Sequence, residues 1–116
     1  MRFAIPLALA TLVLPLSAQA ADPHSYAQPD QVRVSHLDLD LAVDFAKKEL
    51  RGQATLTLDW KNAKAQDLIL DTRDLAIAKV SALGADGKSV ALKFTLAPRD
   101  KELGSKLTIV APTHPD

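Results

Sequence analysis

Three histidines, at positions 24, 36 and 114, are the residues best suited to bind a metal ion. Zinc sites usually combine such histidines with cysteines or carboxylates at short spacings, as in the helical motif His-Glu-x-x-His. Here the histidines are far apart in the sequence, none belongs to such a motif, and the chain contains no cysteine. The spacing therefore indicates solvated surface imidazoles, with His24 and His114 in the terminal tails.

Three aspartates, Asp38, Asp40 and Asp44, alternate with apolar residues between positions 37 and 45. On one face of a strand they could form a cation site, or a carboxylate pair for acid–base catalysis. A strand with an apolar inner face also needs a polar outer face, and alternating aspartates provide one while discouraging edge pairing. We therefore interpret these aspartates as a solvated strand face.

Candidate nucleophiles and phosphate-binding loops lack the motifs that such chemistry requires. No serine lies in a Gly-x-Ser-x-Gly elbow, the turn that presents the nucleophile of many hydrolases. Residues 84–88, Gly-Ala-Asp-Gly-Lys, end like a phosphate-binding loop but have neither its spacing nor a following helix. The sequence therefore predicts no catalytic, cofactor-binding or metal-ligating residue in this chain. The serines considered are Ser25, Ser35, Ser81, Ser89 and Ser105.

The composition excludes further classes of function. Fourteen basic and 14 acidic residues give a formal net charge of +0 over 116 residues, which removes the usual electrostatic basis for coating nucleic acid or membranes. The absence of cysteine excludes disulfides, a thiolate nucleophile and cysteine-ligated zinc or iron–sulfur sites. With 47% hydrophobic and 24% charged residues, the chain is typical of one globular domain.

Residues 1–20 have the pattern of a cleavable signal peptide. Arg2 precedes an uncharged, largely apolar run over residues 3–16, which is shorter than the roughly 20 residues of a membrane-spanning helix. Small residues at the site Ala18-Gln19-Ala20 predict cleavage after Ala20, with cleavage after Ala21 as the alternative. We therefore expect export to the periplasm or the extracellular space without a stable membrane anchor; an uncleaved anchoring helix is the competing interpretation.

The remainder of the chain has the period of two that is typical of β-strands. Apolar residues occupy alternate positions over residues 36–45 and again over 53–60, which predicts an antiparallel hairpin with its two leucine rows on one buried face. Phe45 and Trp60 fall in these apolar rows, so we expect both in the core rather than in a ligand groove. Gly52 is expected at a turn end or a bulge.

Further strands are expected along the second half of the chain. Residues 68–70 form a short apolar run that suggests burial on both faces, and a strand opening at residue 75 shifts phase before Val80, as a bulge would allow. Asp86-Gly87 predicts a two-residue hairpin turn, followed by strands over residues 90–96 and 107–111. No window after residue 30 predicts a helix longer than about two turns.

These strands predict an all-β fold, an antiparallel β-sandwich preceded by a signal peptide. The expected organisation is a signal peptide over residues 1–20, an extended leader over 21–35, the β-sandwich domain over 36–111 and a tail over 112–116.

Three segments, over residues 36–45, 50–58 and 70–77, contain the patterns Val-Asp-Phe, Leu-x-Gly-x-Ala-x-Leu-Thr and Leu-Asp-Thr-x-Asp-Leu. In this order they resemble the amino-terminal domain of the zinc aminopeptidases, the aminopeptidase N and leukotriene A-4 hydrolase-like family, and the resemblance extends from about residue 29 to residue 111. It implies a saddle-like β-sandwich that packs on a thermolysin-like catalytic domain. The activity it implies is removal of amino-terminal residues from peptides.

The chemistry of that family uses motifs that this sequence lacks. The family holds zinc with a His-Glu-x-x-His helix and a later glutamate, and binds the substrate amine with a Gly-x-Met-Glu-Asn strand; none of these motifs occurs here. No functional residue can therefore be carried over, and zinc is expected only in a full-length relative. The expected partner is the catalytic domain, of the same or a longer product, with peptides bound only indirectly and no nucleic acid bound.

The resemblance also implies an incomplete sandwich, that is, a fragment. We expect residues 107–111 or a neighbouring strand to present an unpaired edge, and part of the apolar face to lack a cover. Two alternatives remain open: a free-standing periplasmic β-sandwich that binds a protein or peptide without enzymatic activity, and a soluble inhibitor of a full-length aminopeptidase.

Overall fold

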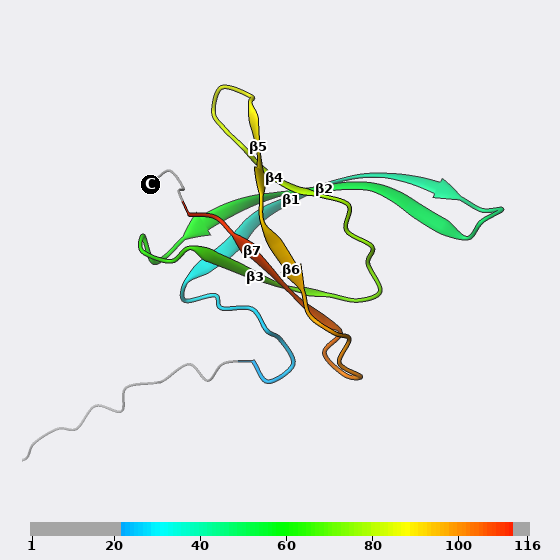
Figure 1. Ribbon diagram of the computed structural model, residues 1–116, viewed down its shortest axis with the longest axis horizontal. Helices are drawn as coiled ribbons and strands as arrows, with labels where there is room; N and C mark the ends of the chain where they lie inside the picture. Colours follow the sequence, from blue (N-terminus) through cyan, green and yellow to red (C-terminus); the bar gives the residue numbers. More distant parts are fainter. Residues whose placement is uncertain (1–21, 113–116) are drawn as a thin grey trace, which may run out of the picture.

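The computed structural model describes residues 22–112, which form seven β-strands and no helix (Figure 1). The predicted signal peptide and most of the tail, including His114, lie outside the described residues. Within residues 22–112 no helix is long and apolar enough to cross a membrane. The strands are β1 (Val32–Asp44), β2 (Glu49–Trp60), β3 (Asp67–Thr72), β4 (Val80–Leu83), β5 (Ser89–Leu92), β6 (Phe94–Leu96) and β7 (Ser105–Val110).

All strand pairs are antiparallel and form three small sheets. β1 pairs with β2, β4 pairs with β5, and the third sheet has the order β3-β7-β6. This arrangement confirms the predicted all-β class and is consistent with a partial β-sandwich. Because β7 is the central strand of its sheet, the free edges of that sheet belong to β3 and β6 rather than to β7.

The β1–β2 hairpin has the register that its two apolar rows require. Leu37 pairs with Leu56 and Leu39 pairs with Ala54, so the two rows share one face, as predicted. β1 begins at Val32, earlier than the predicted start at His36, because a bulge between Val34 and His36 changes the phase of the alternation. Val32 and Val34, which precede the bulge, thereby lie on the same face as the leucines.

Gly52 lies inside β2, opposite Leu41, rather than at the end of the turn. A Cβ atom at this position would lie 1.9 Å from the carbonyl oxygen of Asp40. The close approach of the two strands therefore explains the glycine. The turn itself spans residues 45–48 and ends at Lys48, which has a φ of 55°.

The core is small and lies where β3 and β7 meet the start of β1. Leu68 pairs with Ile109 and Leu70 with Leu107, and β6 covers the other edge of β7. The predicted burial of residues 68–70 on both faces holds in part, since Leu68 is buried while Ile69 and Leu70 are half-buried. The buried apolar residues are Val32, Leu68, Leu107 and Ile109, and Leu58, Trp60, Leu70, Ile77, Val80, Leu92 and Phe94 pack against them.

Two predicted strands differ from the structure. Residues 75–79 form no strand and therefore contain no bulge; they connect β3 to β4, with only Ile77 packed against the core. The predicted strand over residues 90–96 is divided at Lys93 into β5 and β6, which belong to different sheets. The Lys93 carbonyl oxygen accepts a hydrogen bond from the Val110 amide at 2.9 Å, so the division lies where the chain changes its partner.

The turn between β4 and β5 is longer than the predicted two residues. Leu83 pairs with Ser89, and the Gly84 amide donates to the Lys88 carbonyl oxygen at 2.8 Å. Only Gly87 of the Asp86-Gly87 pair has a positive φ, 77°, whereas a two-residue type I′ turn needs two such residues. The hairpin was predicted, but its loop type was wrong.

Candidate functional site

The histidines and aspartates that could bind a cation are placed in solvent. His36 Nε2 lies 3.3 Å from Asp38 Oδ1, with both side chains exposed, and Asp44 accepts a hydrogen bond from the Lys47 amide in the turn. His24 lies in the exposed leader. Among residues 22–112 no group of three or more His, Cys, Asp or Glu side chains is arranged to hold a metal ion. The polar face of β1 is therefore a solvated face in this structure.

The serines take structural positions. The Ser35 hydroxyl donates to the Thr57 carbonyl oxygen at 3.2 Å, beside the bulge in β1. The buried Ser105 accepts a hydrogen bond at its carbonyl oxygen from the Thr72 hydroxyl at 2.7 Å. Ser81 and Ser89 lie on the exposed β4–β5 hairpin. None of these hydroxyl groups is paired with a histidine in the contacts found among the described residues.

One carboxylate attaches the leader to the β3-β7-β6 sheet. Asp71 accepts a hydrogen bond from the Ser25 hydroxyl at 2.5 Å and another from the Tyr26 amide at 2.7 Å. Lys106 pairs with Asp71 across the sheet, and its ammonium group lies 6.0 Å from the centre of the Tyr26 ring. Sequence reasoning missed this contact because it joins residues about 45 positions apart.

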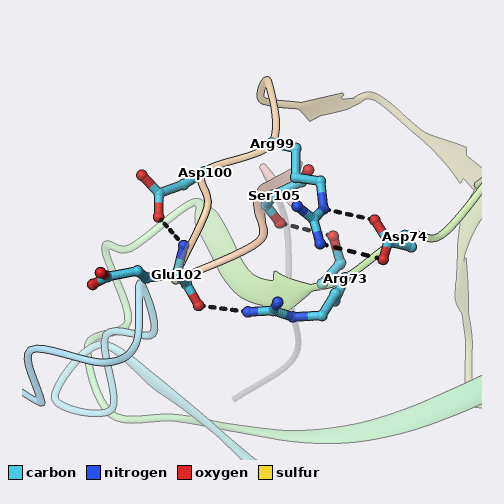
Figure 2. A network of polar contacts seen from close by, with 7 residues as sticks. Arg73, Asp74, Arg99, Asp100, Glu102 and Ser105 are labelled. Atoms are coloured by element: carbon cyan, nitrogen blue, oxygen red, sulfur yellow. Dashed lines mark hydrogen bonds and ion pairs between the residues drawn. The ribbon is translucent and has the colours of Figure 1, made fainter.

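A polar network joins the loop after β3 to the loop before β7 (Figure 2). Arg99 Nε lies 2.7 Å from Asp74 Oδ1, and Arg73 Nη2 donates to the Glu102 carbonyl oxygen at 2.5 Å. Gly104 has a φ of 76°, and a Cβ atom there would lie 2.1 Å from the Thr72 carbonyl oxygen. The two loops are thus held against each other by groups that already have partners within the protein.

Asp100 is the acceptor at the centre of the second loop. Its Oδ1 accepts hydrogen bonds from the amides of Leu103 and Glu102, each at 2.8 Å. These two hydrogen bonds, the Leu103 bond first, lower the pKa of the Asp100 carboxyl below its ordinary value of 3.8, and the Arg73 guanidinium lowers the pKa further. The carboxylate therefore caps the loop between Asp100 and Gly104.

A shallow apolar hollow of about 360 Å³ lies between the leader, the start of β1 and β3. Its only charged lining residue is Arg33, whose Nε donates to the Pro29 carbonyl oxygen at 2.8 Å. Binding sites for small molecules usually combine an apolar lining with several convergent polar groups, which this hollow lacks. The hollow lining residues are Ala27, Pro29, Val32, Arg33, Val34, Leu68, Ile69 and Leu70.

The most prominent surface feature is the apolar side of the β1–β2 hairpin, which we call the ribbon face. Its exposed members include Leu39 at 59%, Val43 at 55% and Leu50 at 65% exposure. The hairpin extends away from the other strands, which make few contacts with it (Figure 1). The ribbon face comprises Val34, Leu37, Leu39, Leu41, Val43, Leu50, Ala54 and Leu56.

The prediction that this leucine face is buried is therefore wrong for the described residues. Alternation correctly gave the two faces of the hairpin, but no second layer of residues 22–112 covers the apolar one. Phe45, at 86% exposure, is not in the core either, because it lies in the turn at the far end of the hairpin. Trp60, at the other end, packs against the core as expected.

The fold and the surface together define a small antiparallel β domain whose largest uncovered feature is a sheet face. No protein-family model matches the sequence. The sequence is 35% identical to leukotriene A-4 hydrolase from Xenopus laevis over 92 residues, which are 79% of this chain and 14% of that protein. It is 30% identical to leucine aminopeptidase 2 from Sclerotinia sclerotiorum over 92 residues, 78% of this chain and 14% of that protein.

A leukotriene A-4 hydrolase homolog from Botryotinia fuckeliana is also 30% identical over 92 residues, with the same coverage of both chains. The chain is therefore a homologue of the leukotriene A-4 hydrolases and leucine aminopeptidases, and the resemblance to this family is confirmed. It spans 14–15% of the length of these relatives, a share consistent with an amino-terminal domain.

Proposed function

We propose that this chain is the amino-terminal β domain of an exported zinc aminopeptidase, and that it has no peptidase activity by itself. The observation that carries the proposal is the 35% identity to leukotriene A-4 hydrolase over 79% of the chain. In this proposal the domain supports a catalytic domain that removes amino-terminal residues from peptides. Peptides would contact the β domain only through that assembly.

The three sequence motifs that resemble the family form the framework of the fold. The first begins in β1 and ends at Phe45 in the turn, the second lies in β2, and the third begins in β3 and ends in the connection to β4. Their residues form the paired part of the hairpin, the close approach at Gly52 and the Asp71 contact to the leader. The resemblance therefore concerns residues that position strands, which supports a structural role for the domain.

Zinc is the metal that this family implies, and the described residues do not fit it. Residues 22–112 bring together no set of three potential ligands, and the printed sequence contains no His-Glu-x-x-His motif. We therefore assign no residue of this chain to zinc and derive no catalytic step from it. The aminopeptidase chemistry of the proposal belongs to the catalytic domain.

The inactivity of the domain is tested with the product purified from cells that express the full 116-residue chain. We expect less than stoichiometric zinc by elemental analysis, and no cleavage of aminoacyl anilides above a buffer control. Stoichiometric zinc together with anilide cleavage that a chelator abolishes would overturn this part of the proposal. A preparation of an active zinc aminopeptidase serves as the positive control for the assay.

Export is tested separately through the predicted signal peptide. Small side chains at Ala18 and Ala20 suit the signal peptidase, so replacing both by leucine is expected to leave an unprocessed precursor in a pulse-chase experiment. The matched control replaces Ala8 and Ala10 by leucine in the apolar run, where bulk is tolerated. Equal processing of both variants would contradict the proposed cleavage site.

A second candidate function is supported by the ribbon face. Exposed apolar patches of several hundred Å² mark interaction sites, so the chain could serve as a free-standing binding module. Independent folding separates the two candidates, because a module unfolds in one cooperative transition whereas a fragment of a larger sandwich forms a loosely packed or aggregating state. Urea unfolding followed by circular dichroism measures this difference.

A further inference from the structure

We infer that residues 22–27 of the leader, held by Asp71, protect the mature amino terminus of the product from aminopeptidases. We call residues 22–27 and Asp71 the leader clamp. Two parts of the proposed function underlie this inference: cleavage of a signal peptide, and an aminopeptidase activity in the same product that meets its own amino terminus as a substrate. Cleavage after Ala20 makes Ala21 the first residue, directly before the clamp.

Asp71 holds the leader with both oxygens of its carboxylate. Oδ2 accepts a hydrogen bond from the Ser25 hydroxyl at 2.5 Å, and Oδ1 accepts one from the Tyr26 amide at 2.7 Å. Hydrogen bonds to an ionised acceptor are stronger than those between neutral groups. Ser25 and Tyr26 are half-buried, whereas the leader residues on either side of them are exposed. The clamp is therefore closed at the fifth and sixth residues counted from Ala21.

A turn folds the residues ahead of Ser25 back on themselves. The Ser25 amide donates to the Asp22 carbonyl oxygen at 3.3 Å, and the His24 amide donates to Asp22 Oδ1 at 2.8 Å. The Ala27 amide donates to the Ser25 hydroxyl oxygen at 3.0 Å. An extended peptide is recognised largely through its backbone groups, and here these amides already have partners. A peptidase must therefore open the clamp before it can bind these residues.

The clamp is attached to the best-packed part of the domain. Asp71 lies on β3 and pairs with Lys106 of β7, whose ammonium group is 6.0 Å from the centre of the Tyr26 ring. The same two strands contribute Leu68 and Leu107 to the buried core. Opening of the leader therefore breaks contacts to a sheet that stays folded, which makes it a local event.

Two prolines determine where trimming of the amino terminus can stop. A bond to a proline nitrogen is a tertiary amide without an N–H group, and many aminopeptidases do not cleave it. Pro23 places such a bond after Asp22, so an enzyme of this kind removes at most Ala21 from the wild type. Pro29 places the next one after Gln28. Replacing Pro23 therefore separates the effect of the clamp from the effect of the proline.

The test follows the amino terminus of the exported product by mass spectrometry during incubation with an added broad-specificity aminopeptidase that does not cleave bonds to proline. In Pro23→Ala the clamp is the remaining barrier, and we expect slow trimming. Pro23→Ala combined with Asp71→Ala should be trimmed at least about tenfold faster, because cleavage of a locally opened segment follows the population of its open state. The trimmed product should begin at Gln28, since Pro29 stops the enzyme.

The matched control combines Pro23→Ala with Asp67→Ala, which removes a carboxylate of the same strand that takes no part in the clamp. It should be trimmed no faster than Pro23→Ala alone. Circular dichroism verifies that the variants keep their β content. If the Asp71→Ala variant does not fold, Pro23→Ala combined with Ser25→Ala decides, because it removes one of the two Asp71 contacts from the leader side and should also speed trimming.

Incubation without an added enzyme tests the product's own activity on its amino terminus. The variant with Pro23→Ala and Asp71→Ala should shorten to Gln28, and a chelator should prevent this, whereas the wild type should keep its terminus in both samples. Anilide cleavage by the same sample reports on the proposed function separately. A product that cleaves no anilide fails the proposed function, while the added aminopeptidase still measures the clamp.

Three results would overturn the inference. Equal trimming of Pro23→Ala with and without Asp71→Ala would show that the carboxylate does not protect the leader. Rapid trimming of Pro23→Ala alone to Gln28 would show that the proline is the whole barrier. A mature terminus ahead of Ala21 would place the clamp away from the end of the chain, whereas cleavage after Ala21 leaves the clamp and both prolines in place.

Discussion

The stability of this small domain is expected to depend on very few side chains, and Leu107→Ala tests this dependence. Leu107 lies on the central strand β7, is only 5% exposed and pairs with both Leu70 and Leu96. Truncating a buried leucine costs about 2–5 kcal/mol, and we expect about 3 kcal/mol here. Because a small domain has only about 5–15 kcal/mol of stability, this one change should remove a large share of it.

Trp60 provides the assay. It is the only tryptophan of the chain and packs against the core, so its fluorescence reports on the packing that Leu107 supports. Under the binding-module candidate, in which the chain unfolds in one cooperative transition, a urea m-value near 1 kcal/mol/M converts a loss of about 3 kcal/mol into an unfolding midpoint about 3 M lower. The matched control is Leu83→Ala at a 65% exposed position, where we expect a shift below about 0.5 M. Equal shifts for the two variants would refute the assignment of the core.

Three further predictions follow from the loops and the leader. Gly104→Ala should destabilise by at least about 1 kcal/mol more than Gly87→Ala in urea unfolding, because both glycines have a φ near 77° but only Gly104 faces a backbone oxygen. The stability advantage of the wild type over Asp100→Asn should be constant near neutral pH and disappear as the pH falls through the lowered pKa of Asp100, below 3.8. Asp71→Ala should speed hydrogen exchange at the Tyr26 amide, whereas Asp67→Ala on the same strand should not.

Each of these predictions has an opposite result that would count against it. Equal destabilisation at the two glycines would place Gly104 away from the Thr72 carbonyl. The sign of the pH effect follows from a carboxyl whose pKa is lower in the folded state: its contribution exists above the unfolded pKa and vanishes on acidification. A wild-type advantage that grows toward acid would therefore contradict it. Unchanged exchange at Tyr26 would show that Asp71 does not hold the leader.

Local sequence patterns predicted the features that residues close together in the sequence determine, namely strands and their two faces. Alternation over residues 36–45 and 53–60 predicted the hairpin and its shared apolar face, since a period of two places side chains on opposite sides whatever the rest of the chain does. It could not show whether that face is covered, because a cover comes from residues distant in the sequence. The prediction of a buried face therefore failed at residues such as Leu39 and Leu41, which are exposed in the structure.

Strand pairing and polar contacts were harder to predict for the same physical reason. A continuous alternation over residues 90–96 does not reveal that Lys93 marks a change of sheet, since both halves keep the strand period. The contacts of Asp71 with the leader and of Arg99 with Asp74 join residues at least 25 positions apart, and no short motif encodes them. Asp100, by contrast, bonds the amides of Glu102 and Leu103 only two and three residues away, a local Asx-type contact for which no prediction was made from the sequence.

The central claim is that these strands are the amino-terminal domain of an exported zinc aminopeptidase. Its most direct test is the intact mass of the native product in a periplasmic extract, located by peptides from residues 50–58 and 68–77 and assayed for anilide cleavage in the same fraction. The account predicts a product several hundred residues longer than this chain, with chelator-sensitive aminopeptidase activity, as the 14% coverage of the relatives suggests. A product that ends at Asp116 and fractionates away from all aminopeptidase activity would contradict it.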